Sequence, residues 1–453
     1  MLESHPLPTP LLQLCADPIG ANADVLIVGL SQKSEMSATL AAVDSAGEGW
    51  IGRLIESGKL SGKKGELTLV ASPASCGAAM VLLVGLGESA DITRDSIFNA
   101  AASAIRKVTD QQHDRIVVAL AESCGDEFHD VIVSGSLFAC EGEAIYRSEP
   151  TIKVPGAIEF SGLGQAAIDR GQIIGQSMNH TRRLVNEPAG IIFPESFAQR
   201  AVTIGAEVGL EVEVWDHEKL KAEGCRAMLA VGQASTKPPR LVMLRHNGGG
   251  DEAPIAIVGK GVTFDSGGLS LKTSEGMKTM KCDMAGAATV VGVMHALAKL
   301  GVKKNVIGFC GLAENMVGGD SYKLGDVIET RSGKTIEILN TDAEGRVVLA
   351  DTLNVTIGHN VTVTDSVVGD DSLIGIGSVL APGTIVENDV LLAAGARTAP
   401  GQVLTAGHVW AGAPAKILTE MDDRKRAIVA LTIPMYVEYA DTFMHEEHVP
   451  LVR

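Results

Sequence analysis

Residues 255–268 read IAIVGKGVTFDSGG, an apolar run that gives way to small and acidic residues. The apolar residues 255–259 and a second apolar run at 305–312 predict buried strands, and residues 284–300 between them predict a helix. A strand, a helix and a strand in this order indicate a parallel sheet with helices on its faces. Ligands of such sheets bind at the carboxyl ends of the strands, where we expect Lys260 to lie.

The first third of the chain shows the same alternation. Apolar runs at 24–30, 67–71, 81–87 and 115–121 alternate with segments typical of helices. This pattern predicts a small N-terminal α/β domain over residues 1–160. Gly85 and Gly87 could belong to a nucleotide-binding loop, but the third glycine of that motif is absent. A tight turn between a strand and a loop is the better interpretation, and we expect no cofactor there.

The composition excludes several classes of protein. The chain has 453 residues, of which 45% are apolar and 21% are charged, and its formal net charge of −17 would repel nucleic acid and anionic lipid. No stretch reaches the roughly 18 uninterrupted apolar residues of a membrane span, and the N-terminus lacks the basic residues of a secretion signal. Seven scattered cysteines without a CxxC pair favour reduced thiols. We therefore expect a cytoplasmic protein with no nucleic acid or membrane partner.

Three clusters between residues 260 and 346 carry residue types that bind metal. They read KGVTFDSGG (260–268), LKTSEGMKTMKCD (271–283) and NTDAEGR (340–346). Carboxylates that converge from strand ends supply the hard oxygen ligands that divalent ions prefer, and a shared carboxylate can bridge two ions. Two ions about 4 Å apart can hold both an attacking hydroxide and a carbonyl oxygen. The alternative is that these side chains are solvated, or that Asp342 or Glu344 caps the following helix.

The same clusters carry a resemblance to a known family. NTDAEGR, together with NEP at 186–188 and AVGQAS at 230–235, resembles the leucyl (cytosol) aminopeptidases, to which we assign residues 1–353. The resemblance implies an α/β catalytic domain, here 161–353, that uses two divalent ions, Mn or Zn, to hydrolyse N-terminal residues from peptides. The ligands it implies are Lys260, Asp265, Asp283 and Glu344 for one ion, and Asp265, Asp342 and Glu344 for the other.

The resemblance also implies roles for residues that bind no ion. Lys272 would stabilise the oxyanion of the tetrahedral intermediate. Arg346 would hold a bicarbonate that relays a proton, and Met280 would contact the apolar first side chain of the substrate, such as leucine. The plainer interpretations are a surface lysine at Lys272 and a core methionine at Met280. Lys260 can bind an ion only as the neutral amine, so we expect it to lose its proton in the field of the ion.

After residue 353 the sequence changes to a six-residue period. Ten hexads follow one another from VTIGHN (355–360) to VWAGAP (409–414), and nine of them open with Val, Leu or Ile, Arg397 being the exception. This period predicts a left-handed parallel β-helix over residues 354–416, with three hexads in each coil and the opening residue pointing inward. Residues 418–447 predict an amphipathic helix, and we assign 417–453 to a C-terminal helix.

The hexads and the segment after them, residues 354–447, resemble the γ-class carbonic anhydrases and their non-catalytic relatives, a trimer-forming family. That family binds zinc through three histidines. Here His359 stands at one ligand position and Thr364 at the next, and a catalytic zinc needs three protein ligands. We therefore expect no carbonic anhydrase activity, and a packing role for Trp410. The aminopeptidase pattern stops at residue 353, before the last third of that family's catalytic domain, so the chain resembles a chimera of two families.

Two functional hypotheses follow from this organisation. The first is a metal-dependent aminopeptidase that forms a homo-oligomer, either the hexamer of one family or the trimer of the other. The second is a non-catalytic protein whose β-helix trimerises or binds a partner. The number of ions bound by each chain distinguishes them, because the first requires two and the second none or one. An acyltransferase or a carbonic anhydrase is a third class, which the missing histidines disfavour.

Overall fold

The computed structural model describes residues 9–425 except 143–144, 253, 332, 354–361, 364–366, 369–371, 376–377 and 423–424. Contacts divide the chain into two compact units, Met1–Glu187 and Pro188–Arg453. The domain boundaries expected at residues 160, 353 and 416 stay predictions. No helix in the described part of the chain is long and apolar enough to cross a membrane. All seven cysteines are free thiols, as their spacing predicts.

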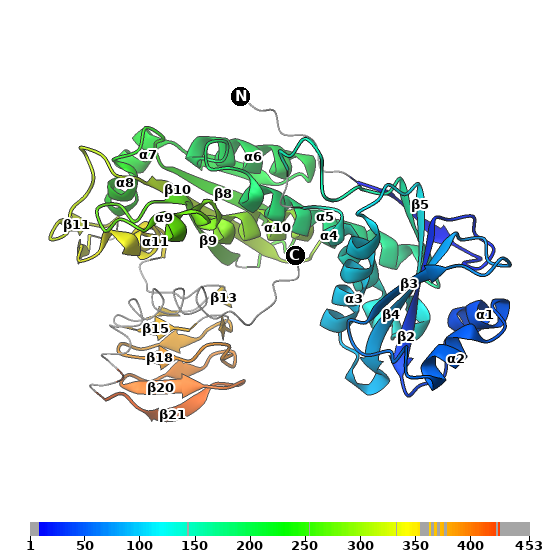
Figure 1. Ribbon diagram of the computed structural model, residues 1–453. Coiled ribbons are helices and arrows are strands. Elements are labelled where there is room, and N and C mark those ends of the chain that lie inside the picture. Colours follow the sequence, from blue (N-terminus) through cyan, green and yellow to red (C-terminus); the bar gives the residue numbers. More distant parts are fainter. Residues whose placement is uncertain are drawn as a thin grey trace. The chain divides into compact units, whose positions relative to one another are not determined.

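In the described residues, the first unit is built on a six-stranded sheet (Figure 1). Its strands, in spatial order, are β1 (Leu11–Cys15), β6 (Ala157–Ser161), β5 (Arg115–Ala119), β2 (Val25–Gln32), β4 (Met80–Glu88) and β3 (Leu67–Ala71). All neighbours are parallel except β3 and β4. The helices are α1 (Ala38–Ala46), α2 (Trp50–Glu56), α3 (Arg94–Val108), α4 (His129–Ala139) and α5 (Gln165–Asn186). The four apolar runs expected to be strands are strands, which confirms the α/β prediction.

Apolar side chains pack on both faces of this sheet. Successive residues of a strand point to opposite faces, and β2 shows this directly. Ile27 packs with Ile97 of α3 in one core, whereas Leu26 packs with Leu40 of α1 and Ile51 of α2 in another. Burial of both faces explains why the strands of this unit read as continuous apolar runs.

Gly85 and Gly87 lie within strand β4 and not in a loop. The register between β2 and β4 shifts after Leu30, and Gly87 there has a φ of +82°. A Cβ at Gly85 would lie 2.0 Å from the carbonyl oxygen of Lys63. The turn expected at these glycines is therefore wrong, because they form an irregularity inside the sheet and let another segment approach closely.

The second unit holds a mixed sheet. In spatial order its strands are β16 (Val379–Leu380), β13 (Thr362–Val363), β9 (Ile255–Asp265), β10 (Asn305–Asn315), β8 (Arg240–Asn247) and β7 (Glu211–Trp215). Its helices are α6 (Pro194–Glu207), α7 (His217–Ala222), α8 (Arg226–Gly232), α9 (Ser274–Met277), α10 (Ala285–Lys299) and α11 (Glu344–Leu353). A short hairpin pairs β11 (Val327–Glu329) with β12 (Thr335–Glu337).

Strands β9 and β10 are parallel and α10 connects them, which confirms the predicted strand–helix–strand unit. The rest of the sheet differs from the expected all-parallel arrangement, since β8 pairs antiparallel with both β10 and β7. The apolar pattern indicates that a segment is a strand, but it carries no information about the direction of its neighbour.

Strand β9 is longer than expected, and this moves Lys260. The strand continues to Asp265, so Lys260 lies in its middle and Asp265 takes the carboxyl end. Glycine usually weakens a strand, but here Gly259 allows close packing, because a Cβ on it would lie 2.4 Å from the carbonyl oxygen of Gly286 in α10. The expectation that Lys260 ends the strand is therefore wrong, although its side chain still reaches the site described below.

The C-terminal hexads form short parallel strands in register. Val367, Ile385 and Val403 are partners in β14 (Val367–Val368), β17 (Ile385–Val386) and β19 (Val403–Leu404). A second row contains β15 (Leu373–Ile374), β18 (Leu391–Leu392) and β20 (His408–Ala411). Each strand pairs with the one three hexads later, and Figure 1 shows β15, β18 and β20 of the second row one above another.

The residues that point into this region are the second ones of the hexads. Its core contains the second residue of six hexads, together with Val390, Ala396 and Ala415; the second residues are Ile374, Leu380, Val386, Leu392, Leu404 and Trp410. The opening residues Ile385 and Val403 are 43% and 42% exposed. The expected inward position is therefore wrong by one residue, and a shift of one residue exchanges the two faces of a strand. The packing role expected for Trp410 is confirmed.

The chain after Ala415 continues as a strand. Residues Lys416–Glu420 form β21, which pairs antiparallel with β20. The amphipathic helix expected from residue 418 is therefore wrong for its first three residues, and residues 426–447 of that prediction lie outside the described chain. His359 and Thr364, the two positions compared with zinc ligands, also lie outside it.

Candidate metal centre

Three acidic side chains meet at the carboxyl end of β9. Asp265 ends that strand, Asp342 lies in a short 3-10 turn (Thr341–Ala343), and Glu344 begins α11. One carboxylate oxygen from each lies within 4.8 Å of the others. Asp265 lies far from Asp342 and Glu344 in the sequence, and the sheet and the turn bring it to them as the motifs predict.

Two lysines join these carboxylates into one charged network. Nζ of Lys260 lies 2.8 Å from Oδ1 of Asp283 and 2.7 Å from Oε1 of Glu344. Nζ of Lys272 lies 3.1 Å from Oδ2 of Asp265 and 2.6 Å from Oδ1 of Asp342, and its side chain is 19% exposed. The plainer interpretation of Lys272 as a surface lysine is therefore wrong. Four carboxylates face two ammonium groups, so negative charge is in excess when all of them are ionised.

Burial governs the protonation of this network. It raises the pKa of Glu344 to about 8; Lys260 opposes this shift, and Asp265 and Asp283 add to it. Burial also raises the pKa values of Asp283 and Asp342. For Lys260, burial acts to lower the pKa, but the carboxylates of Glu344 and Asp283 outweigh it and leave the pKa raised. Lys260 is therefore an ammonium group while only carboxylates surround it, and an ion must replace that proton before the amine can bind it.

The donor set fits divalent cations. Asp283 Oδ2 and Glu344 Oε2 are buried, and neither accepts a hydrogen bond from the described residues. A buried carboxylate oxygen without a partner is costly, and a cation would satisfy it. Carboxylate oxygens are hard ligands of the kind that Mn²⁺, Mg²⁺ and Zn²⁺ accept.

Neither Asp342 nor Glu344 caps the 3-10 turn, whereas the alternative that one of them caps α11 stays a prediction, since Glu344 lies in the first turn of that helix. The residue that caps the 3-10 turn is Asn340, whose side-chain oxygen accepts from the backbone N–H of Asp342 at 2.8 Å. The carboxylate of Asp342 turns instead toward Lys272, and that of Glu344 toward Lys260. Both carboxylates therefore take part in the charged network of the cluster.

Two further residues of the sequence prediction stand apart. Arg346 projects from α11 with an exposed side chain, and Met280 is half-buried in a 3-10 turn, Met280–Cys282. Within the described residues, no hydrogen bond or ion pair joins either side chain to the carboxylates. The structure thus brings together Lys260, Asp265, Lys272, Asp283, Asp342 and Glu344, and it does not bring in Arg346 or Met280.

Sequence reasoning missed the polar residues behind the cluster. Asn315 and Thr341 are fully buried, and Tyr322 is 2% exposed. Nδ2 of Asn315 donates to Oδ1 of Asp265 at 2.8 Å, and the hydroxyl of Tyr322 donates to the carbonyl oxygen of Thr341 at 2.7 Å. The sequence does contain a signal for Asn315. This polar residue comes after the apolar run of β10, just as Asp265 comes after the apolar run of β9.

Glycines shape the loop after Asp265. Gly267 and Gly268 have φ values of +84° and +63°, a region that other residues rarely adopt. The tight turn directs the N–H of Gly267 to Oδ1 of Asp265 at 2.9 Å. A Cβ on Gly267 would lie 2.4 Å from the carbonyl oxygen of Ser270. The positive φ values and this close contact therefore explain why glycine occupies positions 267 and 268 of the loop.

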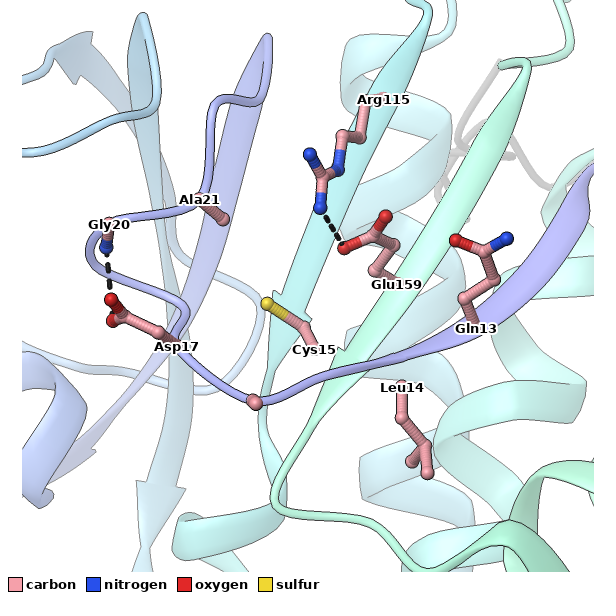
Figure 2. A pocket seen from close by; sticks show the side chains of 9 residues that line it. Gln13, Leu14, Cys15, Asp17, Gly20, Ala21, Arg115 and Glu159 are labelled. Carbon is pink, nitrogen blue, oxygen red and sulfur yellow. Dashed lines mark hydrogen bonds and ion pairs between the residues drawn. The ribbon is translucent and has the colours of Figure 1, made fainter.

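A separate hollow of about 270 Å³ lies in the first unit, lined by residues of β1, β5 and β6 (Figure 2). Two of its charged groups form an ion pair, with Nη2 of Arg115 2.6 Å from Oε2 of Glu159. Burial raises the pKa of the nearby Cys15 thiol, which makes it a poor nucleophile. We assign no function to this hollow.

Comparison with protein families gives two matches. Residues 27–150 match the N-terminal domain of the cytosol aminopeptidase family, and residues 179–373 match the catalytic domain of the same family. A "Probable cytosol aminopeptidase" of Rhodopirellula baltica is 54% identical over 369 residues, which cover 79% of this chain and 73% of that protein. A protein of the same name from Syntrophotalea carbinolica is 38% identical over 355 residues, covering 75% of this chain and 71% of that protein.

Solved structures agree with these matches. A mutant of tomato leucine aminopeptidase superposes with a TM-score of 0.67 at 27% identity, over 79% of this chain and 74% of the other. The bottromycin maturation enzyme BotP in complex with Mn superposes with a TM-score of 0.61 at 34% identity, over 73% of this chain and 68% of the other.

Proposed function

This chain belongs to the cytosol aminopeptidase family and is a metal-dependent aminopeptidase, and from this premise we propose that it works through a two-ion centre. The observation that carries the proposal is the convergence of Asp265, Asp342 and Glu344, whose oxygens lie within 4.8 Å of one another. Two ions that share a carboxylate require such a spacing.

We assign the ligands in two overlapping sets. Lys260, Asp265, Asp283 and Glu344 would hold one ion, and Asp265, Asp342 and Glu344 the other. The buried oxygens of Asp283 and Glu344 without a described hydrogen-bond donor support this assignment. Mn²⁺ or Zn²⁺ would serve, and the predominance of carboxylates favours Mn²⁺. The related BotP, solved in complex with Mn, supports the same choice.

The ions would supply an acidified water and a polarised scissile carbonyl. The protein's own residues would do the rest. Lys272, held beside Asp265 and Asp342, would keep a positive charge where the carbonyl oxygen becomes an oxyanion. The exposed guanidinium of Arg346 would hold a bicarbonate that relays a proton, and Met280 would contact an apolar first side chain such as leucine. The substrates would be peptides with a free N-terminal amine.

A second proposal concerns the C-terminal hexads. The strands that pair three hexads apart, and the core residues at every sixth position, support a left-handed parallel β-helix that resembles the γ-class carbonic anhydrases. The exposed Ile385 and Val403 support a role in assembly. We propose that the chain is a chimera of the two families that forms a homo-oligomer, a trimer or a hexamer, and that it acts in the cytoplasm, where its free thiols stay reduced.

Metal counting and a matched pair of substrates test the first proposal. The full chain is stripped with a chelator, reloaded with Mn²⁺ or Zn²⁺, and its bound metal is measured by mass spectrometry. It is then assayed with leucine p-nitroanilide and with the N-acetylated form of the same compound. We expect two ions per chain and cleavage of the free amine only. Cleavage of both compounds at equal rates would contradict the proposed exopeptidase, and one ion or none would support assembly as the sole function.

A further inference from the structure

Asn315 lies at the point where two strands deliver polar side chains to the metal centre. It ends β10 and is the register partner of Asp265, which ends β9. Its side chain is fully buried. Nδ2 donates to Oδ1 of Asp265 at 2.8 Å and to the carbonyl oxygen of Thr341 at 3.0 Å. Both partners of this amide atom are oxygen acceptors. The atom must therefore be the nitrogen Nδ2, because the amide oxygen cannot donate.

The two oxygens of Asp265 face different partners. Oδ1 accepts from Asn315 and from the backbone N–H of Gly267 at 2.9 Å. Oδ2 lies 3.1 Å from Nζ of Lys272, within the charged network. A carboxylate held by two donors on one oxygen cannot rotate freely, so its other oxygen stays directed into the centre.

The second bond of Asn315 reaches the segment that carries Asp342. Thr341 immediately precedes Asp342, and its carbonyl oxygen accepts from both Asn315 and the hydroxyl of Tyr322. The hydroxyl of Thr341 in turn donates to the carbonyl oxygen of Gly267 at 2.7 Å. One amide group therefore connects the end of β9 to the turn of Asp342, and these two elements carry separate ligands.

We propose that Asn315 is a positioning residue, which orients Asp265 and sets its separation from Asp342 for the binding of two ions. This inference rests on the proposed function, because it takes both aspartates as ligands. A purely structural role would make a different prediction. Loss of a buried amide that only stabilises the fold lowers the melting temperature without changing the metal affinity of the folded protein.

Asn315→Leu tests the inference, because leucine has a similar volume but no donor. Tyr322→Phe is the matched control, since it removes the other donor to Thr341 and leaves Asp265 untouched. The full chain is titrated with Mn²⁺ alone, with free Mn²⁺ followed by electron paramagnetic resonance, and the metal-free proteins are melted. We expect Asn315→Leu to weaken Mn²⁺ binding by about 10-fold to 100-fold, and Tyr322→Phe to weaken it by much less. If Asn315→Leu does not fold, Asn315→Ala takes its place.

Asp265→Asn, measured in parallel, separates two kinds of failure. If it leaves Mn²⁺ affinity unchanged, or if the wild-type chain binds no Mn²⁺, the ligand assignment fails and the inference fails with it. If Asp265→Asn weakens binding while the Asn315 variant binds as the wild type does, only the inference is overturned. Equal weakening by Asn315→Leu and Tyr322→Phe would also overturn it, because the carbonyl of Thr341 would then be the group that matters.

Discussion

Asp265 and Asn315 close two adjacent parallel strands as register partners, and Nδ2 of Asn315 lies 2.8 Å from Oδ1 of Asp265. A carboxylate and its supporting amide are therefore fixed by the same sheet. Backbone hydrogen bonds between β9 and β10 hold the pair, so little conformational entropy is lost when an ion binds.

Lys272→Ala should lower turnover of leucine p-nitroanilide by about 100-fold to 1,000-fold, the usual effect of removing one group that stabilises an oxyanion. The metal content should stay at the wild-type value, because Lys272 is not a proposed ligand. Lys278→Ala is the control, since that lysine lies in the same segment and its one ion-pair partner in the described part of the chain is the exposed Glu275. A loss of metal together with activity in Lys272→Ala would show that the lysine supports the ligands instead.

Asp342→Ala should lower metal content and activity together, because the change removes a proposed ligand. Metal is measured by mass spectrometry after dialysis against a limiting concentration of Mn²⁺. Glu275→Ala provides the comparison, as it deletes an exposed carboxylate from the segment of Lys272. Full metal content in the inactive Asp342 variant would remove Asp342 from the ligand set.

Gly267→Ala should destabilise the protein and weaken Mn²⁺ binding. Its φ of +84° disfavours a side chain, and the new Cβ would lie 2.4 Å from the carbonyl oxygen of Ser270. Gly250→Ala is a matched variant, because Gly250 also has a positive φ, of +59°, but no atom of the described residues beyond its two chain neighbours lies within 4 Å of its Cβ position. We expect about 1 kcal/mol from the backbone conformation alone in Gly250→Ala and more in Gly267→Ala. Urea unfolding measures both, and equal losses would contradict the steric argument.

Leu404→Ala should reduce stability much more than Val403→Ala. Leu404 is fully buried in the C-terminal core, whereas the neighbouring Val403 is 42% exposed. Deletion of a buried leucine side chain typically costs about 2–5 kcal/mol. Thermal and urea unfolding of both variants decide the question. A larger loss in Val403→Ala would mean that the opening residues of the hexads point inward after all.

The order of helices and strands and the acidic motifs could be predicted from the sequence, because apolar periodicity and short motifs are local properties of the chain. Asp265, Asp342 and Glu344 could be named in advance for this reason. The polar end of β10 marks Asn315 as a candidate, but its contact with Asp265 could not be predicted, because that contact depends on the register between the strands. The register of β9 and β10 shifts between Ala313 and Glu314, and no local pattern reports such a shift.

The hexads illustrate a second physical reason for error. Their first two residues are both apolar in Ile385-Val386, Leu391-Leu392 and Val403-Leu404. With two apolar residues side by side, the period of six is visible but its phase is not, since either residue could face inward. The decision comes from packing, which buries Val386, Leu392 and Leu404.

Strand β21 has a consequence for how the C-terminal region ends. Parallel rows of short strands could in principle add further coils, or recruit another molecule onto their last strand and grow into a fibre. Strand β21 runs opposite to β20, and their register is irregular between Val409 and Trp410. Its ends carry the charged residues Lys416 and Glu420. A further parallel strand would therefore meet a reversed and charged edge, which disfavours that growth. Among the described strands, the reversed β21 therefore closes one of the two rows, that of β15, β18 and β20, against end-to-end growth.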